Sequence, residues 1–212
     1  MSREAHVRFC ESVGVRLPRA THLAIYVSSP RSAERVRVSI TQWLAKELEL
    51  EVNQEKSRSG PCGGSSLLGF QLAADGKIAV AQKAIAQLKD NVRKLWDARQ
   101  SKTSNELRDQ WRRYIDGWWN YFGLTEATWP IKEIGKWIRR HIRKAFWQRW
   151  HRPAGRKAAL RRLGVRGRLL KLAHSSEGAW PMAKHAVMNT ALSIRQLRKY
   201  RLDVPWDFAA SR

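Results

Sequence analysis

The spacing of apolar residues changes near residue 81 of this 212-residue chain. Before that point, short apolar runs are separated by polar or glycine-containing stretches. The run 23–27 (LAIYV) predicts a buried strand, and Ser29-Pro30 predicts the start of a helix over about 30–48. Leu50 and Val52 predict a second strand. A helix between two strands is the pattern of a small α/β unit, which we place in residues 20–80.

A hairpin is predicted to close this unit. The runs SLLGFQL and KIAV flank the sequence AADG, and the pair Asp75-Gly76 is typical of a tight turn between antiparallel strands. The α/β unit therefore has the predicted order strand, helix, strand, hairpin.

From residue 81 onward the apolar residues recur with a period of 3.6, which indicates amphipathic helices. A first helix contains Ile85 to Trp96, and a second contains Leu107 to Phe122 with Thr103 and Glu106 spaced as a capping box. Trp129-Pro130 predicts the start of a third helix, which Pro153 and Gly155 are expected to end. Shorter helices are predicted near 156–163, 166–173 and 181–199. The fold class is therefore predicted as α+β.

Positive charge is concentrated in one stretch. Residues 131–171 contain fifteen Lys or Arg and one acid, Glu133, and contribute +14 of the net charge of +23. Charge this dense repels itself unless an anion lies beside it, and nucleic acid is the anion that gains affinity from each neutralised phosphate. The alternative is a solvated helical surface, which we discount because solvated surfaces usually mix both signs. The predicted phosphate contacts are Lys132, Lys136, Arg139, Arg140, Arg143, Lys144, Arg149, Arg152, Arg156, Lys157, Arg161, Arg162, Arg166, Arg168 and Lys171, the first six on the outer face of the third helix.

Other classes of protein are disfavoured. Two cysteines, Cys10 and Cys62, are too few for a disulfide framework or a four-cysteine zinc site. The first residues lack the apolar core of a signal peptide, and no apolar run approaches the roughly 20 residues that span a bilayer. We therefore expect a soluble, cytoplasmic protein with no membrane partner.

Several aromatic and histidine residues could have either a structural role or a role in binding. Trp111, Trp118 and Phe122 share one helical stripe and are expected in the core. One of Trp147 and Trp150 is a candidate for stacking on a base, and the sequence leaves this open. His141 and His151 have no carboxylate or cysteine partner at ligand spacing, so we expect surface or capping roles. Gly117 inside a helix suggests the close approach of a neighbour.

Six motifs occur in an order that resembles the C-terminal part of bacterial group II intron reverse transcriptase–maturases. They are NQEKS (53–57), LLGF (67–70), YIDGWWNYFGL (114–124), WIRRHIRKAFWQRW (137–150), RRLGV (161–165) and GAW (178–180). The resemblance covers residues 19 to 200. It implies a partial polymerase palm over 19–80, a helical thumb over 81–125 and a helical maturase-specific domain over 126–205, after a non-matching segment 1–18. It also implies that the partner is group II intron RNA, with DNA as a further candidate during intron mobility.

One departure from the family concerns catalysis. The family's polymerase motif is Tyr-Ala-Asp-Asp, and the corresponding residues here are Arg19, Ala20, Thr21 and His22. Neither Thr21 nor His22 replaces a carboxylate for Mg²⁺, which only an intact polymerase of the family would require. We therefore expect no catalytic residue, no cofactor and no metal, and a protein that binds intron RNA and assists splicing without polymerase activity. The alternatives are an inactive fragment from a degenerate reading frame, or half of a split reverse transcriptase. The oligomeric state is left open, because the strand 23–27 is predicted to have a free edge.

Overall fold

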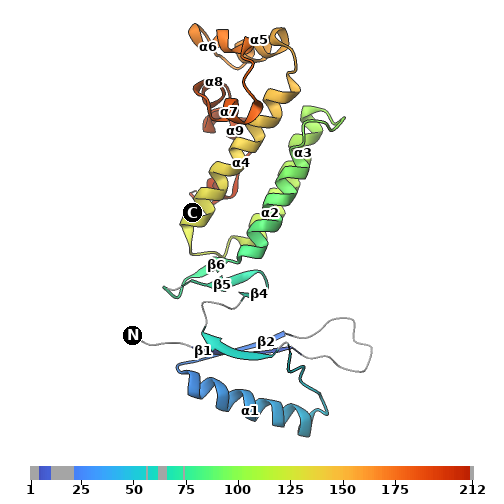
Figure 1. Cartoon of the computed structure of the whole chain (residues 1–212), viewed down its shortest axis with the longest axis vertical. Helices are drawn as coiled ribbons and strands as arrows, with labels where there is room; N and C mark the ends of the chain where they lie inside the picture. The colour runs from blue at the N-terminus through green and yellow to red at the C-terminus, as the bar shows by residue number, and fades with distance from the viewer. Residues whose placement is uncertain (1–4, 11–21, 56, 62–65, 74, 211–212) are drawn as a thin grey trace. The chain divides into compact units, whose positions relative to one another are not determined.

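The computed structural model describes residues 5–10, 22–55, 57–61, 66–73 and 75–210. The chain divides into two compact units, Met1–Ala81 and Gln82–Arg212 (Figure 1). The first contains strands and one long helix, and the second contains only helices among its described residues. The predicted α+β class is confirmed.

The first unit contains a three-stranded antiparallel sheet covered by one helix. The strands are β1 (Ala5–Cys10), β2 (His22–Val27) and β3 (Arg58–Pro61), in the order β2-β1-β3, and the register places Val7 opposite both Ile25 and Ser59. Helix α1 (Pro30–Glu47) packs on all three strands. As predicted, Ser29 is its N-cap, and the Ser29 hydroxyl accepts a hydrogen bond from the Ser32 N–H. The strand 23–27 and the helix 30–48 are therefore confirmed within two residues.

Two strands of this sheet differ from the sequence prediction. No element was predicted for residues 1–18, yet β1 lies there, at the centre of the sheet. The predicted strand at Leu50 and Val52 is wrong, because Val52 forms only an isolated bridge and both residues pack in the core beneath α1. The third strand is instead the polar segment 58–61 (RSGP), which has no apolar alternation. It is a strand because β1 supplies backbone partners, which is a tertiary effect.

The predicted hairpin is confirmed. Strands β4 (Ser66–Leu67), β5 (Phe70–Leu72) and β6 (Ile78–Val80) form a second antiparallel sheet, and Phe70 lies opposite Val80. Its turn contains Gly76 at φ +80°, which is a conformation that favours glycine. The single run SLLGFQL becomes two strands because Leu68 and Gly69 both have positive φ and reverse the chain.

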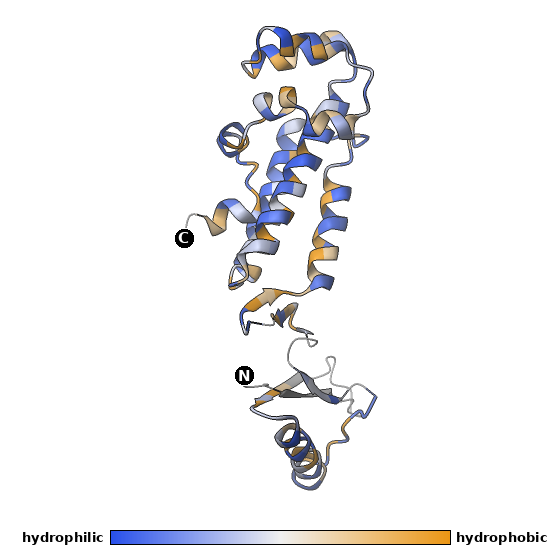
Figure 2. Ribbon diagram, turned by 60° about the vertical axis from the view of Figure 1, so that its left-hand side comes forward, coloured by the Kyte–Doolittle hydropathy of each residue, from blue (hydrophilic) through white to orange (hydrophobic). Residues whose placement is uncertain are grey.

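Three long helices dominate the second unit, as the apolar period predicts. They are α2 (Gln82–Leu95), α3 (Ser104–Phe122) and α4 (Thr128–Arg149). Figure 2 shows hydrophobic and hydrophilic segments alternating along these helices, which is the banding of an amphipathic helix. The capping box is confirmed: the Glu106 N–H donates to the Thr103 hydroxyl, and the Thr103 N–H donates to the Glu106 carboxylate at 2.7 Å.

Helix α4 ends earlier than predicted. Its last residue is Arg149, and His151 then adopts φ +36°, which turns the chain. Pro153 does not end α4. It occupies the first turn of α5 (Pro153–Arg162), where its fixed φ suits a helix start. Gly155 lies inside α5, where a Cβ would be 2.8 Å from the Trp150 carbonyl oxygen.

The remaining helices are short. They are α6 (Arg168–Lys171), the 3-10 helix η2 (Leu172–His174), α7 (Ala179–Lys184), α8 (Ala186–Ala191), α9 (Ile194–Lys199) and α10 (Pro205–Ala209). The predicted helix 181–199 is therefore three helices, and α10 was not predicted. Helix α4 packs against α2, α7 and α10, and Figure 1 shows it alongside α2.

The core of the helical unit is aromatic and aliphatic. Trp111 is fully buried, and its indole N–H donates to the Asp203 carbonyl at 2.9 Å, which fixes α3 to the segment before α10. Ile138 and Ile142 of α4 are also fully buried. Trp118 is buried and its ring packs on Phe122 at 4.7 Å between centroids. The expectation that this stripe belongs to the core is confirmed for Trp111 and Trp118, whereas Phe122 is half-buried.

Gly117 of α3 and Gly135 of α4 have opposite surroundings. The inference of close packing at Gly117 is wrong, because a Cβ built there meets no atom within 4 Å. Close packing occurs instead at Gly135 of α4, where a Cβ would lie 3.0 Å from the Trp206 Cβ and 3.2 Å from the Val204 Cγ2. Glycine at 135 therefore permits the close approach of the segment that contains α10.

We expect Gly117→Ala and Gly135→Ala to change stability in opposite directions. Alanine at 117 should raise the free energy of unfolding by about 1 kcal/mol, since glycine costs about that much in a helix and the site has room. Alanine at 135 should lower it by about 1–2 kcal/mol because overpacking outweighs the same helical gain. Urea unfolding of both variants, followed by circular dichroism, measures the two changes. Equal stabilisation by both would show that α10 does not lie against Gly135.

Candidate nucleic-acid interface

The fifteen predicted contact residues fall into three environments. Four arginines bond to other parts of the protein: Arg139, Arg143, Arg149 and Arg156. Three cations of α4 lie over rings or beside a carboxylate: Lys132, Lys136 and Arg140. The side chains of the other eight make no hydrogen bond or ion pair with a described residue: Lys144, Arg152, Lys157, Arg161, Arg162, Arg166, Arg168 and Lys171.

Arg139 is part of a buried ion cluster. Its side chain is 7% exposed, and its Nη2 donates to Asp207 Oδ1 at 2.7 Å. The same oxygen accepts from Nη2 of Arg198 at 2.7 Å, and Asp207 Oδ2 accepts from the Val204 N–H at 3.0 Å. The expectation that Arg139 lies on the outer face of α4 is wrong, because α10 covers this position and brings the carboxylate that pairs with it.

Arg143 and Arg149 donate to backbone carbonyls. Nε and Nη2 of Arg143 both lie 3.0 Å from the Leu192 oxygen, just after α8. Burial, with the nearby charges of Arg139 and Arg140, lowers the pKa of Arg143 to about 10, so it stays charged at neutral pH. Arg149 donates to the carbonyls of Gln100 and Lys102 in the segment before α3. These guanidiniums therefore connect α4 to its neighbours.

The two candidate stacking tryptophans differ. Trp147 is 1% exposed, and the Arg156 guanidinium lies 4.4 Å from its ring centre, so this indole belongs to the core. Arg156 also donates to the Ser175 carbonyl at 3.1 Å. Trp150 is half-buried and lines a pocket at the end of α4. Of the pair, only Trp150 has a surface that a base can reach.

Seven of the eight unpaired cations gather on α5, α6 and their flanking residues. Six of them are exposed and Lys157 is half-buried, and no Asp or Glu occurs between Glu133 and Glu177. The turn between α5 and α6 contains Gly164 at φ +85°, and the Val165 N–H donates to the Leu160 carbonyl at 2.9 Å. This closes α5 in the manner of a glycine C-cap. We call the seven residues Arg152, Lys157, Arg161, Arg162, Arg166, Arg168 and Lys171 the cationic surface.

A second group combines cations with aromatic rings on α2, α4 and α7. The His141 ring lies between Trp137 and Trp180, with centroid distances of 4.0 Å and 4.9 Å. Arg93 lies 5.4 Å from the Trp137 ring centre, and Arg140 lies 5.3 Å from that of Trp180. Cations over aromatic faces are favourable, and the arrangement leaves these guanidiniums near the surface.

Comparison with known families identifies part of this unit. Residues 85–164 match the family model of the group II intron, maturase-specific domain. The helical unit therefore carries a group II intron maturase-specific domain. The match confirms the resemblance inferred from the motifs over this range. No curated protein matches the chain.

The maturase-specific match runs from α2 to the residues just after α5. It includes the helices that the sequence analysis assigned to a thumb, so the boundary at residue 125 stays a prediction. The palm assignment of residues 19–80 lies outside the match and also stays a prediction.

The helical unit contains one contact group that the sequence analysis did not predict. Lys89 and Arg93 of α2 and Trp180 of α7 lie outside the stretch 131–171 on which the charge argument rested. The sequence of α2 contained an indication of this group, because Lys89 and Arg93 are spaced i, i+4 along one edge of its apolar stripe. The prediction of a surface or capping role for His141 is wrong, since its ring is half-buried between two indoles.

His141 should make the stability of the maturase-specific domain depend on pH. Burial, followed by the charges of Lys144, Arg93 and Arg140, lowers the pKa of His141 from 6.5 to about 4. The unfolded imidazole takes up a proton below about pH 6.5 while the folded one does not, so stability falls as the pH drops from 6.5 to 4. The melting temperatures of the wild type and His141→Gln at pH 7 and pH 5 test this. The wild type should lose more stability than the variant, and equal losses would assign the effect to other groups.

Potential metal ligands are scattered over the part of the chain that the structure describes. No three His, Cys, Asp or Glu side chains among them gather in a way that could hold a metal ion. Arg19, Ala20 and Thr21 lie outside the described residues, and His22 begins β2. None of the described helices combines the length and apolarity that crossing a membrane requires.

Proposed function

We propose that this protein binds folded group II intron RNA through its maturase-specific domain and assists splicing without polymerase activity of its own. The observation that carries the proposal is the cationic surface, whose seven side chains have no partner among the described residues. Phosphates would neutralise this charge and release counterions. The aromatic and cationic group around His141 adds rings that suit exposed bases.

Recognition in this proposal depends on RNA shape more than on sequence. Lys and Arg side chains on helices contact the backbone and carry little base information. Structured RNA presents loops and junctions at fixed distances, and a cationic surface on a rigid helical unit matches such an arrangement better than it matches a regular duplex. Duplex DNA is a weaker candidate partner for the same surface.

The test is the salt dependence of binding to a group II intron transcript and to an unrelated RNA of equal length. If about six phosphates are engaged, log affinity falls with log salt at a slope of roughly −4 to −5 for both RNAs. A preference for the intron that persists at high salt supports the proposal. Equal affinities for the two RNAs at every salt concentration would show that the protein binds RNA through its charge alone and does not recognise the intron.

A further inference from the structure

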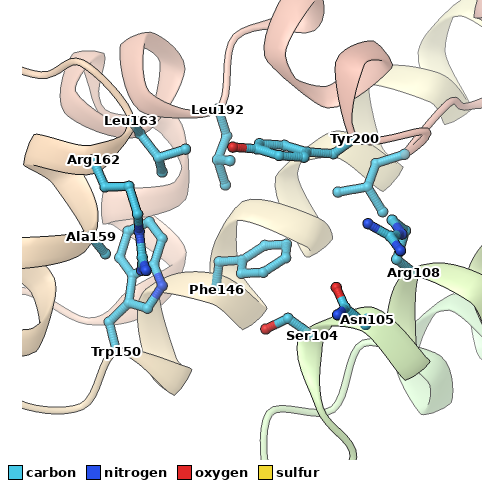
Figure 3. Close-up of a pocket in the computed structure, with 11 residues that line it drawn as sticks. Ser104, Asn105, Arg108, Phe146, Trp150, Ala159, Arg162, Leu163, Leu192 and Tyr200 are labelled. Carbon is cyan, nitrogen blue, oxygen red and sulfur yellow. The ribbon is translucent and has the colours of Figure 1, made fainter.

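A pocket of about 380 Å³ lies between the start of α3, the end of α4, α5 and the segment around α9. Its volume falls within the range of small-ligand sites, roughly 300–1,000 Å³. In Figure 3, Tyr200 and Phe146 lie on opposite sides of it, Trp150 and Arg162 lie at one end, and Asn105 lies at the other. The cationic surface shares one residue, Arg162, with the lining of this pocket.

The walls combine aromatic faces with free polar groups. Phe146, Trp150 and Tyr200 provide ring surfaces. The side chains of Asn105, Arg162 and Tyr200 make no hydrogen bond with a residue that the structure describes. An amide both donates and accepts, as the edge of a nucleobase does, and a guanidinium suits a phosphate.

Charge favours an anionic ligand with a flat apolar part. No Asp or Glu lines the pocket, whereas Arg108 and Arg162 both do. Arg162 also belongs to the cationic surface, so a strand held by α5 passes the pocket at this residue. Splayed bases in RNA loops are recognised by stacking on aromatic rings and by hydrogen bonds to their edges.

Hydrogen bonds hold the walls of the pocket in place. Arg149 connects the end of α4 to the segment before α3, and the Thr103–Glu106 capping box fixes the first turn of α3 beside Asn105. The Tyr200 N–H donates to the Gln196 carbonyl at 3.1 Å, which fixes Tyr200 at the end of α9. A preformed site of this kind loses little conformational entropy on binding.

We propose that this pocket binds one nucleobase extruded from the RNA strand that the cationic surface holds. The inference rests on the proposed RNA-binding function and adds a base-binding site to it. Tyr200 and Phe146 stack on the base, Asn105 bonds to its edge, and Arg162 contacts the adjoining phosphate.

The experiment compares the full chain with Tyr200→Leu, Tyr200→Phe and the control Trp129→Leu, which removes an aromatic side chain that is 71% exposed and lies outside the pocket. Dissociation constants are measured for a group II intron transcript, the length-matched RNA and a fully paired RNA duplex. Tyr200→Leu should weaken binding to the intron roughly 5- to 100-fold. Its salt slope should be unchanged, and so should its affinity for the duplex, which extrudes no base. Tyr200→Phe and Trp129→Leu should bind like the wild type.

Ultraviolet cross-linking of the wild-type protein to the same transcript needs no substitution. Cross-linked nucleotides should map to peptides that contain Tyr200, Phe146 or Trp150, and cross-links confined to other peptides would overturn the inference. If the wild type prefers the intron and Tyr200→Leu binds the intron as tightly as the wild type does, the base-binding pocket is excluded and the proposed function stands. If the wild type shows no preference for the intron, but Tyr200→Leu weakens binding to both the intron transcript and the length-matched RNA, the pocket is supported and the proposed function is not.

Discussion

Replacing Asp207 with alanine should lower the free energy of unfolding of the helical unit by about 3–5 kcal/mol. The carboxylate accepts from Arg139, Arg198 and the Val204 N–H, and it is 5% exposed. Its removal leaves the buried guanidinium of Arg139 without a counter-charge in a medium of low polarity. Urea unfolding of the full chain, followed by circular dichroism, measures the loss.

Asp109→Ala is the matched control for this substitution. Asp109 is 63% exposed and pairs with Arg108 at 3.4 Å on the surface of α3. Exposed pairs contribute little, so this variant should remain within about 0.5 kcal/mol of the wild type. A loss below about 1 kcal/mol for Asp207→Ala would show that water reaches Arg139.

Replacing four residues of the cationic surface with glutamine should weaken RNA binding about a thousand-fold near 0.1 M salt. The four are Arg161, Arg166, Arg168 and Lys171, all exposed and all outside the pocket. Each lost phosphate contact removes roughly 0.7–0.9 from the slope of log affinity against log salt, so the slope should flatten by roughly 3. Filter binding across a salt series measures both quantities.

The same number of cations can be removed from the first unit as a control. Arg31, Arg35, Lys46 and Arg58 are exposed there. Their replacement by glutamine lowers the net charge equally, and it should change the affinity less than tenfold if the cationic surface makes the phosphate contacts. Equal losses from both sets would mean that total charge, and no particular surface, determines binding.

Sequence periodicity was sufficient for the long helices and insufficient for the sheet. Helices α2 and α3 follow apolar residues that recur every 3.6 positions, and Thr103 and Glu106 mark where α3 begins. Strand β1 has a weak alternation at Val7 and Phe9 that was overlooked, and β3 has none. Strands of that kind are set by the backbone they pair with, which a single sequence does not show.

The sequence also could not predict which basic residues are buried and paired and which lie at the surface. Arg139 and Arg140 are neighbours of the same type, yet one pairs with a buried carboxylate and the other lies over Trp180 near the surface. Asp207, the carboxylate that pairs with Arg139, lies in the short helix α10, whose five residues are too few to show a helical period. The clearest indication of this helix in the sequence is Pro205, because proline is common in the first turn of a helix.

The contacts of α10 have a consequence for synthesis of the chain. Helix α4 is complete once residue 149 has been made, but Gly135 and Arg139 acquire their neighbours only when residues 204–207 follow. Likewise, the indole N–H of Trp111 has no acceptor until Asp203 has been made and its carbonyl is in place. On the ribosome, the nascent helical unit therefore leaves Gly135 uncovered and Arg139 without its carboxylate until residues 203–207 emerge, and a stop codon upstream of 203 would leave it in that state permanently.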